Sequence, residues 1–92
     1  STSSVLARVR QYVHGIEVVN DLNVSMYGEV GRRYDVSTFD NIYAIIDNYD
    51  SCLASGQKVN DALSKLTDAI NQLNTLTNAV LNNTSATDTT AE

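Results

Sequence analysis

The chain has no proline, four glycines, one cysteine and no tryptophan among its 92 residues. An all-β chain of this length would need many turns, and turns recruit proline and glycine. The scarcity of both therefore disfavours a sheet and leaves long helices unobstructed. The single cysteine, Cys52, excludes an internal disulfide and gives no sign of an oxidising compartment.

Long apolar runs and an excess of positive charge are also missing. The apolar runs span only a few residues, so we expect no membrane span, and no basic-then-apolar leader opens the sequence. A net charge of −5 argues against nucleic acid, whose phosphates are held by a surplus of Lys and Arg. We therefore expect protein partners and a cytoplasmic or virion-associated location rather than secretion.

The charge is unevenly distributed along the chain. Residues 1–34 carry four arginines and three acids, a net +1, whereas residues 35–92 carry two lysines and eight acids, a net −6. This asymmetry favours either head-to-tail contacts between copies or two solvated faces of unequal charge.

The size of the chain allows one small domain, which buries only about 60–65 % of its unfolded surface. Without disulfides or a metal, such a domain commonly gains its remaining stability by oligomerisation. We expect a single helical domain at 1–81. Residues 82–92 are Asn, Thr, Ser, Ala and acid, with no large apolar side chain, which predicts a disordered tail.

The first predicted helix covers about residues 4–22. Apolar side chains recur there at alternating steps of four and three, which is typical of an amphipathic helix. The stripe comprises Val5, Val9, Tyr12, Ile16 and Val19, widened by Leu6 and Val13. Gly15 costs about 1 kcal/mol relative to alanine inside a helix and therefore indicates a kink or a close helix contact.

The periodicity fails from 23 to 36, and two glycines punctuate this stretch, so we interpret it as a loop. A short β-hairpin is the alternative, because several apolar residues here are spaced by even numbers. The loop contains Arg32, Arg33 and Tyr34, a basic pair followed by an aromatic side chain, which predicts a contact with a protein partner. Solvated charge and phosphate binding are the competing interpretations.

The second predicted helix covers residues 38–55. Ser37 can accept a hydrogen bond from a free N–H of the first turn, and Asp40 places negative charge near the positive helix N-terminus. The apolar residues that follow at helical spacing are Phe39, Ile42, Ile46, Tyr49 and Leu53. We predict that Gly56 ends this helix in a left-handed conformation, the alternative being one helix that continues through it.

The strongest periodic pattern lies at 58–81, the third predicted helix. Apolar residues recur there every seven residues, with companions three positions further on, as in a coiled coil. We predict that this ridge is a partner interface, comprising Val59, Leu63, Leu66, Ile70, Leu73, Leu76 and Val80. The helix carries no charge after Asp68, which favours a polar subunit interface over an ordinary surface face low in charge.

Few residues suggest chemistry. His14 is the single histidine, and with Cys52 it forms no cluster with metal-ligand spacing, so we expect neither a metal nor a cofactor. We interpret His14 as a surface residue and Cys52 as a packing residue at a helix seam. No nucleophile elbow or glycine-rich phosphate loop occurs, and we predict no catalytic residues and no enzymatic activity.

Together these patterns predict an all-α fold, a small up-down bundle or helical hairpin of two to three helices completed by oligomerisation. The expected function is that of a non-enzymatic structural subunit, of virion or secretion-apparatus type, that packs into a homomeric or mixed assembly. A small adaptor, chaperone or regulator that binds a different protein through the same apolar face is the alternative.

Overall fold

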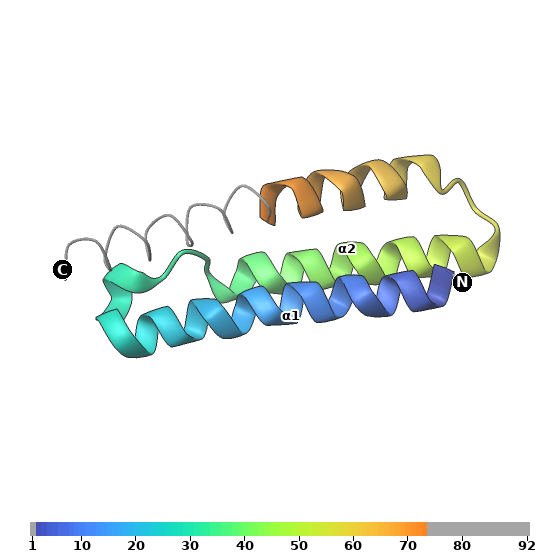
Figure 1. Ribbon diagram of the computed structural model, residues 1–92. Helices are drawn as coiled ribbons and strands as arrows, with labels where there is room; N and C mark the ends of the chain where they lie inside the picture. The colour runs from blue at the N-terminus through green and yellow to red at the C-terminus, as the bar shows by residue number, and fades with distance from the viewer. Residues whose placement is uncertain (1, 74–92) are drawn as a thin grey trace.

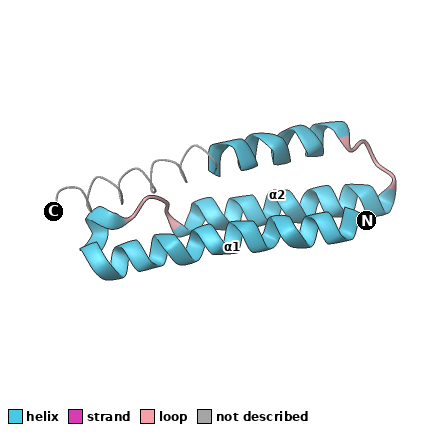
Figure 2. Cartoon of the chain, in the orientation of Figure 1, coloured by secondary structure: helices cyan, strands magenta, loops and turns pink. Residues whose placement is uncertain are grey.

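The computed structural model describes residues 2–73, which form three helices connected by two turns (Figure 1, Figure 2). The elements are α1 (Thr2–Tyr27), the short 3₁₀ helix η1 (Gly28–Gly31), α2 (Val36–Ser55) and a third helix at 60–73. Successive helices run in opposite directions, so α1 and the third helix point the same way and α2 is antiparallel to both (Figure 1). The predicted all-α, up-down architecture is confirmed.

The helix α1 continues through Tyr27, so the loop and hairpin predictions are wrong for residues 23–27. Its buried positions are Leu6, Val13 and Ile16, followed by the amides Asn20 and Asn23. The apolar period stops before the helix does because polar side chains occupy the last core-facing positions. Residues 28–35 form η1 and an irregular turn, and no strand occurs anywhere in residues 2–73.

Asn20 holds the returning chain against α1. Its Oδ1 accepts hydrogen bonds from the backbone N–H groups of Arg33 (2.8 Å) and Tyr34 (3.1 Å). Its Nδ2 donates to the carbonyl oxygen of Tyr34 (3.0 Å). Buried backbone groups need such partners because water does not reach them. A polar residue at a core-facing helix position therefore fixes the turn between α1 and α2.

Two glycines let the chain reverse direction after α1. Gly28 adopts a φ of 74°, a left-handed conformation that side chains disfavour, and α1 ends at the residue before it. Gly31 packs so closely on α1 that a Cβ there would overlap the backbone oxygen of Asn23. A larger residue at Gly31 would therefore push the turn away from the helix and from Asn20.

The helix α2 begins at Val36, two residues before its predicted start. The backbone N–H of Thr38 donates to the carbonyl oxygen of Asp35 (3.0 Å), and no side chain caps the helix at Asp35. The capping role predicted for Ser37 is therefore wrong, because Ser37 already lies inside the first turn.

The end of α2 agrees with the sequence. Gly56 has a φ of 68°, in the left-handed region. Its N–H donates to the carbonyl oxygen of Leu53 (3.4 Å), and the N–H of Gln57 donates to that of Cys52 (3.2 Å). These two hydrogen bonds lead back to the end of α2 and satisfy carbonyl oxygens of its last turn. The predicted break at Gly56 is confirmed.

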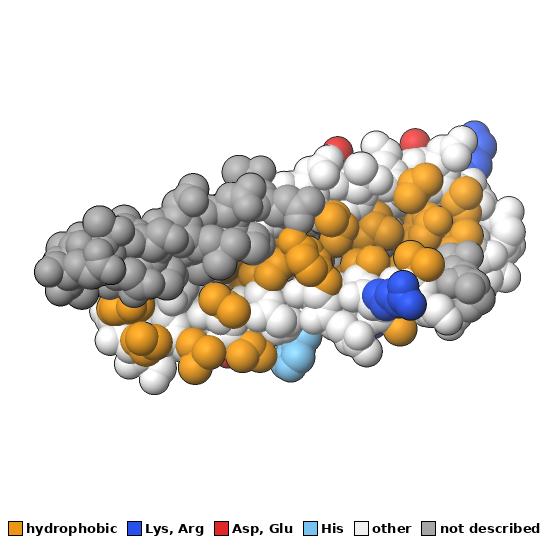
Figure 3. Space-filling view, viewed as in Figure 1, with side chains coloured by type: hydrophobic (Ala, Val, Ile, Leu, Met, Phe, Trp, Pro, Cys, Tyr) orange, Lys and Arg blue, Asp and Glu red, His pale blue; other side chains and the backbone are white. Residues whose placement is uncertain are grey.

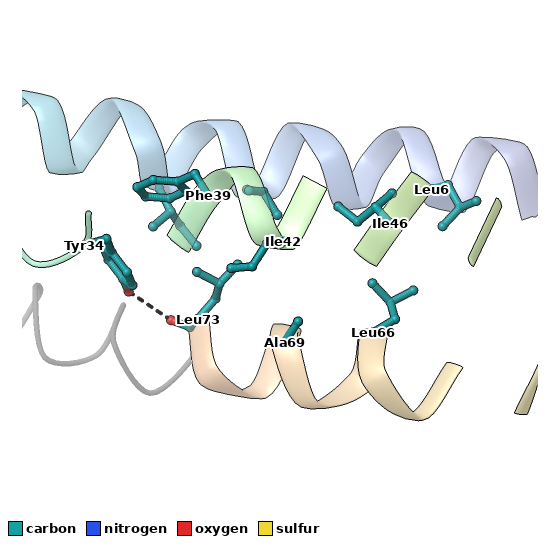
Figure 4. Packing of buried hydrophobic residues seen from close by; sticks show 10 residues of the cluster. Leu6, Tyr34, Phe39, Ile42, Ile46, Leu66, Ala69 and Leu73 are labelled. Carbon is teal, nitrogen blue, oxygen red and sulfur yellow. Dashed lines mark hydrogen bonds between the residues drawn. The ribbon is translucent and has the colours of Figure 1, made fainter. Parts of the chain in front are cut away.

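All three helices contribute to one hydrophobic core (Figure 4). Its most deeply buried side chains are Leu6 and Val13 of α1, Phe39, Ile42 and Ile46 of α2, and Leu73 of the third helix. Tyr34 closes one end, with its ring tilted 52° against that of Phe39 at 5.2 Å between centroids. The Tyr34 hydroxyl donates to the carbonyl oxygen of Leu73 (3.4 Å), which ties the turn to the third helix.

Polar contacts join α1 to α2 outside the core. An Arg10 Nη2 lies 3.2 Å from Asp47 Oδ1 and 3.7 Å from Asp50 Oδ2. The Tyr43 hydroxyl donates to Glu17 Oε1 (2.9 Å). Burial of the phenol and this carboxylate together raise the pKa of Tyr43 to about 12, because both oppose the phenolate.

Candidate interaction surface

The predicted interface on the third helix is mostly covered by the chain itself. Leu66 and Leu73 are buried against α1 and α2, as are Ala62 and Ala69 on the same seam. The interface prediction is corrected for Leu66 and Leu73, because they fill the chain's own core and present no surface to a partner. The seven-residue period identified a packing face but not the chain that packs on it.

The remaining members of that ridge are divided. Leu63 is 45 % exposed, and Val59 and Ile70 are half-buried at the edge of the seam. Leu76 and Val80 lie outside the described residues. The exposed side of the third helix therefore contributes an apolar edge rather than a full face.

Arg32 and Arg33 both form hydrogen bonds within the turn that contains them. Arg32 forms two hydrogen bonds with Glu29, from Nε to Oε2 (2.8 Å) and from Nη2 to Oε1 (3.1 Å). This paired guanidinium lowers the pKa of Glu29. An Arg33 Nη1 donates to the carbonyl oxygen of Val30 (3.0 Å).

The loop surface predicted at Arg32, Arg33 and Tyr34 is thus only partly available. Tyr34 is buried in the core, which corrects its assignment to a partner contact. The two arginines border an open hollow of about 380 Å³ that also includes acidic side chains. Because charges of both signs line it, this hollow shows no clear preference for an anion or a cation.

A larger uncovered surface lies on α1. Seven exposed residues follow one another along it at alternating steps of three and four, and we call them the outer stripe: Val5, Arg8, Tyr12, Gly15, Val19, Leu22 and Met26. Five are apolar or aromatic, and Met26 is 67 % exposed. An exposed row of apolar side chains of this kind is compatible with a protein partner.

The outer stripe corrects the face predicted for the first helix. Val5, Tyr12 and Val19 belong to the single stripe predicted for this helix, but all three are exposed, and Val19 retains 43 % of its surface. Leu6, Val13 and Ile16 face the core instead. The sequence contained a sign of this second face, since Val5, Tyr12, Val19 and Met26 recur every seven residues by themselves. One broad stripe had been inferred where α1 carries two.

The outer stripe meets the third helix in a shallow apolar hollow. Val5, Arg8, Val9 and Tyr12 of α1 line it together with Ile70, and its volume is about 320 Å³. Figure 3 shows hydrophobic side chains gathered along the space between α1 and the third helix, and further ones along α1 itself. The two parallel helices thus form an apolar groove.

Groups with potential chemistry lie apart from this groove. His14 is exposed, with its Nδ1 3.5 Å from Glu17 Oε1, and Cys52 is a half-buried free thiol. Among residues 2–73 no three His, Cys, Asp or Glu side chains gather closely enough to hold a metal ion. In the same part of the chain, none of the helices has the length and hydrophobicity needed to cross a bilayer.

In comparisons with known proteins, no family model, no curated protein and no solved structure matches the chain. The geometry of the outer stripe is therefore the basis for a functional proposal.

Proposed function

We propose that the chain is a non-enzymatic assembly subunit that packs through an amphipathic helix face into a homomeric or mixed protein assembly. The observation that supports this function is the outer stripe of α1. Its five large apolar side chains stay exposed after the chain has completed its own core. A partner that covers these side chains removes apolar surface from water, which makes association more favourable.

The shape of the surface favours a helical partner. Residues at steps of three and four are the contacts that one helix offers to another. Ile70 of the third helix lies beside Val5 and Tyr12 of the stripe, so a fourth helix would touch two helices at once. Among the seven positions of the stripe, Arg8 is the one that carries a charge.

The proposal is tested by the mass of the native particle. Light scattering at micromolar concentration should give a mass above that of the monomer for the natural sequence. The double substitution Val19→Gln with Leu22→Gln should give a monomer with unchanged helical circular dichroism, because both residues are exposed. Val36→Gln is the matched control, since Val36 is an exposed valine at the start of α2, away from the stripe.

The same surface also suits an adaptor that binds a different protein. In that case the purified chain would be a monomer that binds a hydrophobic dye, and the partner protein would displace the dye. A monomer that neither binds dye nor recruits a protein from its source would contradict both functions.

A further inference from the structure

The fold itself gives no reason for the glycine at position 15. Gly15 lies in the middle of α1, is exposed, and is not in a left-handed conformation. A Cβ there would meet no other part of the described chain within 4 Å. After proline, glycine is the residue least favourable to a helix, so this position weakens α1 without helping the chain to pack. Its missing side chain does, however, allow another backbone to approach closely.

Gly15 is also the central position of the outer stripe. Three members precede it and three follow it, at distances along the helix that differ by no more than one residue. We infer that the stripe is covered by α1 of a second copy, which runs antiparallel and crosses at Gly15. This inference deepens the proposed assembly function by naming the partner, and it depends on that function.

The antiparallel direction follows from the residues that it brings together. With the crossing at Gly15, Tyr12 of one copy lies at the level of Val19 of the other, and Val5 at the level of Met26. Apolar side chains therefore meet apolar side chains at both of these levels. When a two-fold rotation about the centre of the stripe relates the two copies, each stripe faces an identical stripe, as a two-fold interface requires.

Charge disfavours the parallel direction. In a parallel pair the Arg8 side chains of the two copies would face each other, and like charges in contact repel. In the antiparallel pair Arg8 lies at the level of Leu22 of the second copy. Its aliphatic stem covers the leucine while the guanidinium reaches water. The basic first half of α1 also lies beside the half that carries Glu17 and Asp21.

The apolar hollow next to Ile70 gives the second copy a place to bind. It lies between the levels of Val5 and Tyr12, and the crossing brings Leu22 and Met26 of the second copy to these levels. Two-fold symmetry forms this contact twice. The five exposed apolar residues of the stripe offer on the order of 500 Å² per copy, compared with the roughly 800 Å² per partner of a standard interface.

Disulfide trapping in the full chain tests the direction of pairing. Cys52 is first replaced by serine, and Tyr12→Cys and Val19→Cys are then made as separate variants. Mixed together and oxidised, they should form a covalent dimer through a 12–19 bond. Tyr12→Cys alone should form little, because its two copies lie about 9 Å apart along the helix axis. Efficient dimers from each variant alone would show a parallel pair and overturn the inference.

Two other outcomes separate this inference from the proposed function. If no intermolecular disulfide forms but the natural chain still enters a larger particle with a second protein, the assembly function stands and the self-pairing is wrong. If no disulfide forms and the chain remains a monomer that recruits no protein, both are wrong.

Gly15→Gln tests the crossing point. Glutamine is a good helix former, so the thermal midpoint of the monomer, measured well below the dimer dissociation constant, should stay the same or rise. Its side chain should hold the two helices apart and raise the dimer dissociation constant at least tenfold. His14→Gln is the matched control, because it changes an exposed neighbour on another face and should leave dimerisation within twofold. An unchanged or tighter dimer from Gly15→Gln would overturn the close crossing.

Discussion

The helix α1 and the third helix both repeat apolar residues every seven positions, yet the fold treats the two series differently. On the third helix the series containing Leu66 and Leu73 is buried in the core. On α1 the series containing Val5, Tyr12 and Val19 is exposed, while a second series packs inward. The apolar period of a helix therefore shows that it has an apolar face. When a helix has two such faces, the packing of its neighbours determines which one is buried.

The difference arises from what each helix must cover. The third helix has one apolar seam, which α1 and α2 hide, and outside it Leu63 and Ile70 form only an apolar edge. The helix α1 carries a wider apolar arc, and its neighbours cover only part of that arc. The surplus apolar surface on α1 is the observation that supports the proposed assembly function.

The comparison is tested most strongly by two leucines of the third helix. Leu66→Ala should lower the free energy of unfolding by about 3 kcal/mol, because it leaves a cavity in the core. Leu63→Ala should cost less than about 1 kcal/mol, since Leu63 is largely solvated. Urea unfolding of both variants at one protein concentration measures the difference. Equal losses of unfolding free energy would mean that the third helix does not pack with Leu66 in the core and Leu63 exposed.

Asn20 tests how much the buried polar residues near the end of α1 contribute to the free energy of unfolding. Asn20→Ala removes the acceptor of two buried backbone N–H groups and the donor to a third group. The expected loss is about 2–3 kcal/mol in urea unfolding. Asn41→Ala, at an exposed position of α2, should stay within about 0.5 kcal/mol. If Asn20→Ala leaves the free energy of unfolding unchanged, the two glycines hold the turn without Asn20.

Tyr43 makes the contact between α1 and α2 dependent on pH. Because the pKa of Tyr43 is raised to about 12 in the folded protein, the fold holds this proton more tightly than the unfolded chain does. Its contribution is complete below pH 10 and is lost as the pH rises toward 12. Allowing for solvent screening, the loss should be about 1 kcal/mol.

Tyr43→Phe is the control for this pH dependence. Urea unfolding between pH 9 and 12 should show a flatter decline for Tyr43→Phe than for the natural chain, because phenylalanine has no proton to lose. Parallel declines would assign the pH dependence to other groups and would separate Tyr43 from Glu17.

The smallest effect is expected at the ion pairs of Arg10. Both acidic partners are well exposed, so Arg10→Ala should cost less than about 1 kcal/mol and even less in high salt. Arg8→Ala, on the outer stripe, should leave the unfolding free energy of the monomer within about 0.5 kcal/mol. A large loss from Arg10→Ala would mean that charge, and not the core, sets the α1–α2 contact.

Much of the architecture was predictable because its signals are local. The absence of proline, the period of the third helix and Gly56 gave the helical class and the break after α2 correctly. The end of α1 was missed because Asn20 and Asn23 interrupt the apolar pattern while still facing inward. Their role depends on backbone groups of the turn, which no spacing of side chains reveals.

The candidate surface was harder to predict than the fold. Leu66 and Leu73 were assigned to a partner because a short chain was expected to leave its ridge uncovered, but α1 and α2 are long enough to hide it. The outer stripe was overlooked because Val5 and Tyr12 border the true core face, and a helical pattern alone does not separate adjacent faces.

Local sequence features are enough to specify the helices and the end of α2, because backbone propensity and glycine conformation act within a few residues. Which apolar face becomes core and which remains exposed is settled only when the helices pack together. That choice depends on how the neighbouring helices pack, since burial is a property of the assembled fold and not of any one segment.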